Sequence, residues 1–169
     1  DYDPSDKATQ MFFAQIQNKL LYAVTGQTAA ELITARADAS APNMNLTAFK
    51  GKVVRKGDIT TAKNYLTADE IDSLNRLTVI FLETAELRVK DKQTLTIDYW
   101  RETVDKLLAF NDKAVLQGAG RISHAQMEAH INALYNQFDA QRKAQQAIEA
   151  DKQDLEETDP LTIDAIEQS

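Results

Sequence analysis

The stretch TADEIDSLNRLTVIFLETA, residues 67–85, predicts a long α-helix with a well-defined start. Thr67 and Glu70 have the spacing of a capping box, in which each side chain accepts a hydrogen bond from a free backbone N–H group. One face carries apolar or small residues at helical spacing, namely Ile71, Leu74, Thr78, Phe81 and Ala85. The middle is apolar on almost every side, through Leu77, Val79, Ile80 and Leu82. We therefore expect a long central apolar helix.

Two helices are expected at the N-terminal end of the chain. The first would be capped by Asp3 or Ser5 and end at Gly26. Its buried stripe would consist of Phe12, Ile16, Leu20 and Val24. A short second helix would begin at residue 27 or 28 and end near Arg36.

Between these helices and residue 67 the sequence predicts an irregular connector. Residues 39–57 contain the helix-breaking residues Pro42, Gly51 and Gly57. We expect at most one helical turn there, at residues 46–49. Asp58 is a plausible cap for a further helix that runs through Tyr65.

Two more helices are expected on the C-terminal side. After a break at residues 91–94, a helix would carry Trp100, Val104, Leu107, Leu108 and Val115, and Gly118 and Gly120 would end it. Ser123 would cap a long helix with an inward face formed by Met127, Ile131, Leu134, Tyr135 and Phe138. From about residue 149 the apolar area is too small to offset the entropy of ordering, which predicts a frayed or extended tail.

The expected fold is therefore all-α, an irregular bundle of five to six helices. A single helical domain would cover residues 1–150, and residues 151–169 would form an acidic, flexible tail. The chain has 169 residues, 43% of them hydrophobic, which suits one domain. The absence of cysteine fits a reducing compartment, and we expect a cytoplasmic protein that does not enter a membrane. Because the first residue is Asp1, we expect a fragment of a longer protein.

The candidate binding site is a block of polar residues between Gln17 and Leu66. Amide and charged side chains recur there at positions where core helices normally carry Leu or Ala. The candidates are Gln17, Asn18, Lys19, Glu31, Arg36, Asp38, Asn43, Lys50, Arg55, Lys56, Asp58, Lys63 and Asn64. If their side chains meet in a crevice, they form either a stabilising polar network or a site that orients an anion. A network is the more common outcome.

The charge of the chain is unevenly distributed. The net charge is −7, but six acidic residues without any Lys or Arg follow position 153, so the rest of the chain carries only −1. Lys50, Lys52, Arg55, Lys56 and Lys63, with Asp58 as the one acidic residue among them, form a basic segment of net charge +4. Such a segment could meet phosphate or an acidic partner, although most are simply solvated loops.

Motifs for catalysis, metals or cofactors are missing. There is no cysteine, and His124 and His130 are six residues apart, so they face different sides of a helix. Glu83 and Glu86 lack the histidine partners of a di-iron bundle. The GAG sequence at residues 118–120 does not follow a strand, and no cofactor or metal is expected. The aromatic residues recur at helical spacing and indicate core rather than a surface that stacks bases.

Five phrases of the sequence resemble the bacterial RhuM-type virulence protein family, over roughly residues 1–140. They are MFFAQIQNKLLYAVTGQTAAELITARADASAPNMNLT, FKGKVVRKGDITTAKNYL, LNRLTVIFLETAE, DYWRETVDKLLAFN and GAGRISHAQ. The resemblance implies a helical C-terminal portion of a two-part bacterial protein with an upstream DNA-binding module. It brings no established reaction. Where members of this family often have Gly after Met in the NMGLT-like phrase, this chain has Asn45.

Three functions are compatible with these features. The first is a non-catalytic interaction or assembly domain of a RhuM-like virulence-associated protein, which would self-associate or bind a protein partner and so position the upstream module. The second is contact with DNA or phosphate through the basic segment, which salt should weaken. The third is a toxin-like or phosphoester-acting enzyme that uses Glu31, Asp38 or Asp58 with Arg36, Arg55 or Lys63. We rank the enzyme last, because two of the three carboxylates also have the spacing of helix caps or ends.

Overall fold

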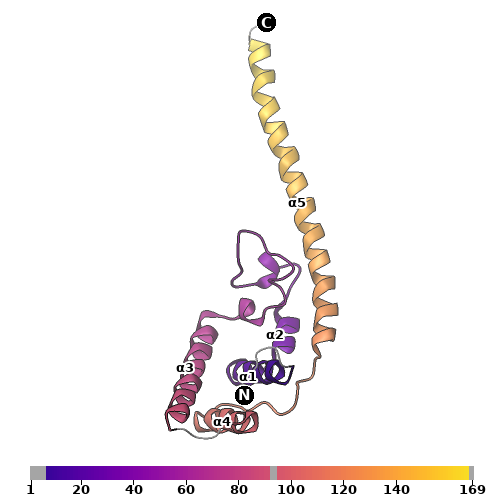
Figure 1. Cartoon of the computed structure of the whole chain (residues 1–169). Coiled ribbons are helices and arrows are strands. Elements are labelled where there is room, and N and C mark those ends of the chain that lie inside the picture. Colours follow the sequence, from indigo (N-terminus) through magenta and orange to yellow (C-terminus); the bar gives the residue numbers. More distant parts are fainter. Residues whose placement is uncertain (1–6, 92–94, 168–169) are drawn as a thin grey trace.

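The chain folds into α-helices joined by loops (Figure 1). The computed structural model describes residues 7–91 and 95–167, with side chains described as far as residue 158. The helices are α1 (Lys7–Thr25), α2 (Ala29–Arg36), α3 (Ala68–Lys90), α4 (Ile97–Phe110) and α5 (His124–Glu167), with the short 3-10 helices η1 (Pro42–Asn45) and η2 (Ala62–Tyr65) between α2 and α3. The described residues contain no strand, which confirms the all-α prediction. Among them, no helix has the combination of length and apolar character needed to cross a bilayer.

The core is one cluster to which all five α-helices and the loop between α2 and α3 contribute, with α3 and α4 adding Leu74, Leu77, Val104 and Leu108. The helices contribute the buried residues Ile16, Leu20, Leu32, Ile33, Met127 and Ile131. The loop contributes Met44, Val54, Ile59, Tyr65 and Leu66, all of them almost inaccessible to solvent. The hydroxyl group of Tyr65 donates to the carbonyl of Ile59 at 2.7 Å, and burial raises the pKa of this tyrosine. A segment expected to be a connector is therefore part of the core.

The helix starts follow local sequence signals. Thr28 with Glu31 and Thr67 with Glu70 form complete capping boxes at α2 and α3. Ser123 accepts a hydrogen bond from the backbone of Gln126 at the start of α5, and the side chain of Gln126 accepts one from the backbone of Ser123. The predicted caps at Thr67 and Ser123 are thus confirmed, and of the two predicted starts of α2, residues 27 and 28, Thr28 is the cap. The predicted caps Asp3 and Ser5 lie outside the described residues.

The loop after α2 differs from its prediction. The expected helical turn at residues 46–49 is absent, and η1 precedes it. Asn43, Met44 and Asn45 all have left-handed backbone conformations, with φ of 55°, 57° and 66°. Asn adopts this conformation more readily than most residues, and burial of the Met44 side chain compensates for its strain. The helix expected from Asp58 is reduced to turns followed by η2.

Helix α3 does not have the central position expected from its sequence. It packs mainly against α1 and forms one side of the molecule (Figure 1). Only Leu74 and Leu77 are buried, whereas Val79 and Leu82 are more than half exposed. The apolar residues in the middle of this helix therefore face two different environments, a packed side and an uncovered side. Its predicted inward face is nevertheless the one that packs, since Phe81 contacts the core cluster.

The last two helices end at other places than expected. α4 stops at Phe110, because Asn111 serves as the C-cap and Asp112 turns the chain with φ of 57°. Val115 therefore lies in a loop, and Gly118 and Gly120 do not end a helix. Helix α5, in contrast, continues through Glu167, where the sequence had suggested frayed or extended chain after residue 149. The flexibility expected of residues 151–169 stays a prediction. Ala, Gln, Glu and Lys dominate this part, and all four favour helix.

Helix α5 has a covered part and an uncovered part. Met127 and Ile131 are buried as predicted, and Leu134, Tyr135 and Phe138 pack on the core cluster. Arg142 donates a hydrogen bond to the carbonyl of Val54 at 3.1 Å and stacks on Phe138 at 5.3 Å. Beyond it, every residue from 143 to 158 is exposed. The helix consequently projects far beyond the rest of the chain (Figure 1).

Candidate functional site

The polar residues of the first half meet most closely at the junction of α2, η2 and α3. The two guanidinium nitrogens of Arg36 donate to the two carboxylate oxygens of Glu70 at 2.6 and 2.7 Å. One of these nitrogens also donates to the carbonyl of Tyr65 at 3.0 Å. Both side chains of the ion pair are partly buried. This bidentate geometry gives the strongest kind of ion pair available to a protein.

Glu70 has a double role at this junction. The Oε1 atom of Glu70, which accepts a hydrogen bond from Arg36, also accepts one from the backbone N–H of Thr67 at 2.9 Å. This second hydrogen bond completes the capping box. The hydrogen bond from Arg36 is the main reason why the pKa of Glu70 falls to about 2, and the pair raises the pKa of Arg36. Both groups are therefore charged at neutral pH. They hold α2 against α3, and both oxygens of the Glu70 carboxylate take part in hydrogen bonds.

Two further candidates connect helices. The side-chain oxygen of Asn18 accepts a hydrogen bond from the backbone N–H of Ala29 at 3.0 Å, so α1 caps the first turn of α2. The ammonium group of Lys19 lies 2.6 Å from a carboxylate oxygen of Asp105, which ties α1 to α4. Gln17, next to them on α1, is exposed. Asn18 and Lys19 thus make structural contacts between helices.

The three candidate catalytic carboxylates all have local hydrogen-bond partners. Glu31 accepts from the backbone of Thr28 at 3.1 Å in the α2 capping box. Asp38 accepts from both the hydroxyl and the backbone of Ser40, and these bonds lower its pKa. Asp58 accepts from the backbone of Arg55 at 2.8 Å in a turn. Each carboxylate shapes the loop or helix end to which it belongs.

The amide candidates stabilise the loop between α2 and α3. The side-chain amide of Asn64 donates a hydrogen bond to the backbone carbonyl of Asp58 at 2.9 Å. The backbone carbonyl of Asn64 accepts one from the backbone N–H of Thr47 at 2.7 Å. Asn43 is exposed and occupies the left-handed turn of η1. Asn45 had no place among the candidates, although its side chain donates to the carbonyl of Arg36 at 2.8 Å. Only its position next to a proline turn could have drawn attention to it.

The basic segment stays open to solvent. Lys50, Lys52, Arg55, Lys56 and Lys63 are all exposed. Within the described part of the chain none of them takes part in an ion pair, whereas Lys19 and Arg36 do. The segment is the group of candidates whose charged ends are available to another molecule.

The described contacts place the thirteen candidates at several different positions in the chain. None of them lines the hollow between α1, α3 and α4 or the shallow hollow on α3. The candidates divide into contacts between helices, caps and turns within the loop, and the exposed basic segment. A binding role for the whole set stays a prediction, and the basic segment is the part that the geometry leaves free for it.

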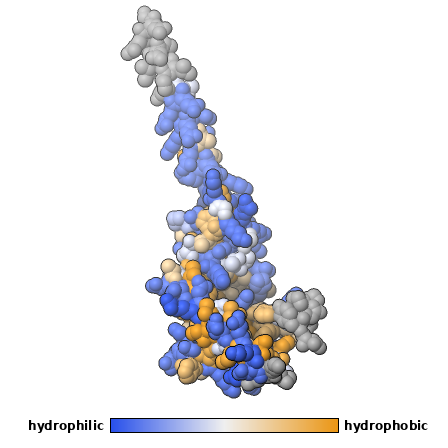
Figure 2. Space-filling model, turned by 60° about the vertical axis from the view of Figure 1, so that its left-hand side comes forward, coloured by the Kyte–Doolittle hydropathy of each residue, from blue (hydrophilic) through white to orange (hydrophobic). Residues whose placement is uncertain are grey.

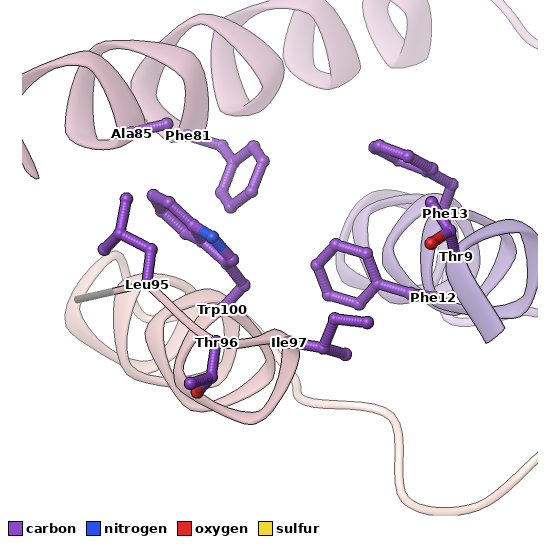
Figure 3. Close-up of a pocket in the computed structure, with 9 residues that line it drawn as sticks. All are labelled: Thr9, Phe12, Phe13, Phe81, Ala85, Leu95, Thr96, Ile97 and Trp100. Carbon is purple, nitrogen blue, oxygen red and sulfur yellow. The ribbon is translucent and has the colours of Figure 1, made fainter. Parts of the chain in front are cut away.

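One hollow is apolar and lies between α1, α3 and α4 (Figure 3). Phe12 and Phe13 from α1, Phe81 from α3 and Trp100 from α4 surround it, and the rings of Phe81 and Trp100 meet edge to face at 5.9 Å. Its volume is about 260 Å³. Thr9 and Thr96 line it as well and are its two hydroxyl side chains. The aromatic residues are therefore packing residues that leave an incompletely filled gap.

A second feature that the sequence did not indicate is the close approach of Gly120 to Thr28 at the start of α2. With φ of 88°, Gly120 lies directly over the start of α2, and a Cβ atom there would be 2.6 Å from the methyl group of Thr28. The loop before α5 thus closes over the α2 capping box. His124 forms an exposed pair with Glu128 on α5, and His130 is exposed as well. Among the described residues no cluster of three or more His, Asp or Glu side chains could hold a metal ion.

Comparisons with known proteins give one positive result. Neither the curated proteins nor the solved structures contain a match to this chain. The model of the Virulence protein RhuM family matches residues 1–146, which include α1 to α4 and the covered part of α5. Since this match spans most of the sequence, the chain belongs to the Virulence protein RhuM family.

Proposed function

We propose that this chain is a non-catalytic assembly domain that joins copies of the protein. The observation that carries the proposal is the uncovered half of α5. All residues from 143 to 158 are exposed, including Ile148 and Leu155. A helix with no tertiary contacts is only marginally stable in water, because helical stability in proteins comes mainly from packing of an apolar face. A second chain would supply that packing.

The fate of the candidate catalytic groups supports the same proposal. Glu31, Asp38 and Asp58 are engaged in caps and turns, and the Arg36 side chain is held by Glu70. These groups explain how the domain holds its shape. An assembly domain requires shape and surface rather than reactive groups, and α5 supplies an extended surface.

The test is the mass of the chain in solution as its concentration rises. In sedimentation equilibrium, the average molar mass should rise from that of one chain at low micromolar concentration to that of two or more chains at high micromolar concentration. Hydrogen exchange at residues 143–158 should slow over the same range. A single-chain mass throughout, with rapid exchange in this part of α5, would contradict the proposal.

A second candidate function is binding to nucleic acid through the basic segment. It is favoured by the five exposed cations, none of which has an ion-pair partner in the described structure. Counterion release would make such binding fall steeply with salt. The test is titration of a DNA duplex at several salt concentrations with the triple variant Lys52→Gln, Arg55→Gln and Lys56→Gln.

A matched control is available for this titration. Lys106, Lys113 and Arg121 are exposed cations elsewhere in the chain, and replacing all three by Gln changes the net charge equally. Loss of binding in the first variant alone would support the basic segment. Equal loss in both would indicate a general charge effect, and no salt-sensitive binding of the parent chain would eliminate this candidate.

A further inference from the structure

The uncovered half of α5 contains a strongly acidic stretch, residues 149–157. Five carboxylates and one ammonium group give it a net charge of −4, and every residue in it is exposed. Figure 2 shows that the projecting part of the helix is covered mainly by hydrophilic residues. Asp72 on α3 and Asp98 on α4, by contrast, each pair with an arginine of the same helix. The acidic stretch is therefore a concentrated charge rather than a mixture of both signs.

The basic segment has the opposite charge in the same amount. Its five exposed cations and Asp58 give a net charge of +4. Each surface also has an uncovered aliphatic side chain, which is Val53 in the basic segment and Leu155 in the acidic stretch. Ile148, directly before the acidic stretch, is exposed as well. The two surfaces are thus complementary in charge, and both offer apolar area to a partner.

Within one chain these two surfaces stay apart. Helix α5 meets the loop of the basic segment through Arg142, which donates to the carbonyl of Val54. Glu149 and Glu156 follow Arg142 at intervals of seven residues, about two helical turns, so they continue the same face. At about 1.5 Å per residue they lie about 10 and 21 Å beyond this contact. Because α5 is a continuous helix, its acidic stretch extends away from the basic segment of its own chain (Figure 1).

We propose that the acidic stretch of α5 docks on the basic segment of a second copy of this chain. The inference rests on the proposed assembly function and names the two surfaces that meet. When two α5 helices lie antiparallel, the outer part of each lies beside the covered part of the other, where the basic segment is. A twofold relation makes the two contacts identical. A parallel pair would instead place the two acidic stretches against each other, which is repulsive.

The first measurement is the salt dependence of self-association. In sedimentation equilibrium of the whole chain, association should weaken by about tenfold or more between about 0.1 and 1 M NaCl, because the Debye length falls from about 10 Å to about 3 Å. Self-association that salt does not change over this range overturns the inference.

The second measurement reverses the charge of each surface in turn. The loop variant reverses three cations of the basic segment, in Lys52→Glu, Arg55→Glu and Lys56→Glu. The helix variant reverses three carboxylates of the acidic stretch, in Glu149→Lys, Glu156→Lys and Glu157→Lys. Each variant alone has like charges on both surfaces, so its self-association should fall by about a hundredfold. An equimolar mixture of the two should associate again, because each altered surface then meets one of opposite charge.

A matched control separates docking from a general attraction between chains of different net charge. It reverses three exposed glutamates on α3 and α4, in Glu83→Lys, Glu86→Lys and Glu102→Lys, and changes the net charge as much as the helix variant does. On its own the control should self-associate like the parent chain. Mixed with the loop variant it should not restore association, because its unaltered acidic stretch repels the altered loop. Fluorescent labelling of the loop variant follows its association in each mixture, and circular dichroism confirms that every variant folds.

Each outcome has a definite meaning. Loss in both variants with recovery in their mixture supports docking of α5 on the basic segment. Self-association that survives either reversal, or that the mixture does not restore, overturns this inference and leaves the assembly function in place. If the loop variant loses binding to a DNA duplex but not self-association, the partner of the basic segment is nucleic acid, and the inference is likewise overturned. A parent chain that is monomeric at every concentration overturns the assembly function itself.

Discussion

Arg36 at the end of α2 and Glu70 in the first turn of α3 form a bidentate ion pair, with nitrogen–oxygen distances of 2.6 and 2.7 Å. The two residues are 34 positions apart in the sequence. Between them lies the loop that supplies several of the most deeply buried core residues. The pair therefore fixes both ends of a long, largely irregular segment.

Removing the charge of Glu70 should destabilise the domain. Glu70→Gln keeps an acceptor for the capping box but loses the ion pair, so we expect the free energy of unfolding to fall by about 1–2 kcal/mol. Glu70→Ala loses both the ion pair and the capping-box acceptor, so the free energy of unfolding should fall by about 1 kcal/mol more than in Glu70→Gln. Urea denaturation measures both values. Arg76→Gln, which removes an exposed pair, is the control and should change stability by less than about 0.5 kcal/mol.

The contribution of Glu70 should depend on pH in one direction. Its pKa is about 2 in the folded chain, against 4.5 for an unperturbed glutamate. Since the folded pKa is lowered, the stabilisation is complete above pH 4.5 and is lost as the pH falls toward about 2. The difference in unfolding free energy between the parent chain and Glu70→Gln should shrink over this interval. A difference that stays constant would show that the ion pair does not stabilise the fold.

Gly120 should tolerate alanine much less well than Gly118. Both have positive φ, 88° and 77°, so alanine is strained at either position. At Gly118 no atom lies within 4 Å of an added Cβ, and the cost should be about 1 kcal/mol. At Gly120 the new methyl group meets buried Thr28, which cannot rotate without breaking the α2 cap, so we expect about 2–4 kcal/mol. Thermal denaturation of the two variants should separate them clearly, and equal effects would contradict the close approach.

Asn45 should be replaceable by glycine more easily than by alanine. Both changes remove the hydrogen bond to the carbonyl of Arg36, but only alanine is strained at φ of 66°. Glycine has a more flexible unfolded state, which reduces the difference, so we expect Asn45→Gly to be more stable by about 0.5–1 kcal/mol. Denaturant unfolding measures the difference. If Asn45→Ala is the more stable, the left-handed backbone at this position is not under strain.

The parts of the fold that could be predicted depend on residues close together in the sequence. The caps at Thr67 and Ser123, and a helix start at residue 27 or 28, were predicted because each signal lies within four residues of the helix that it starts. The inward face of α5 was predicted because Met127 and Ile131 follow helical spacing. These features need no knowledge of what packs against them.

The parts that could not be predicted depend on distant partners. Nothing near Arg36 in the sequence indicates Glu70, and nothing near Gly120 indicates Thr28. The peripheral position of α3 follows from how the other helices pack, because its own apolar residues would equally suit a central helix. The length of α5 was missed for another reason. Intrinsic helix propensity continues there after the apolar stripe has faded.

The contact between Arg142 and Val54 marks the last described link between α5 and the loop of the core. From Arg142 to Glu167 the helix continues without interruption, and at about 1.5 Å per residue it covers roughly 37 Å. The far end of α5 is therefore held at that distance from the last contact with the core while the helix is intact. The reach of α5 changes only if the helix bends or melts, so a second chain that packs on it would also fix its length.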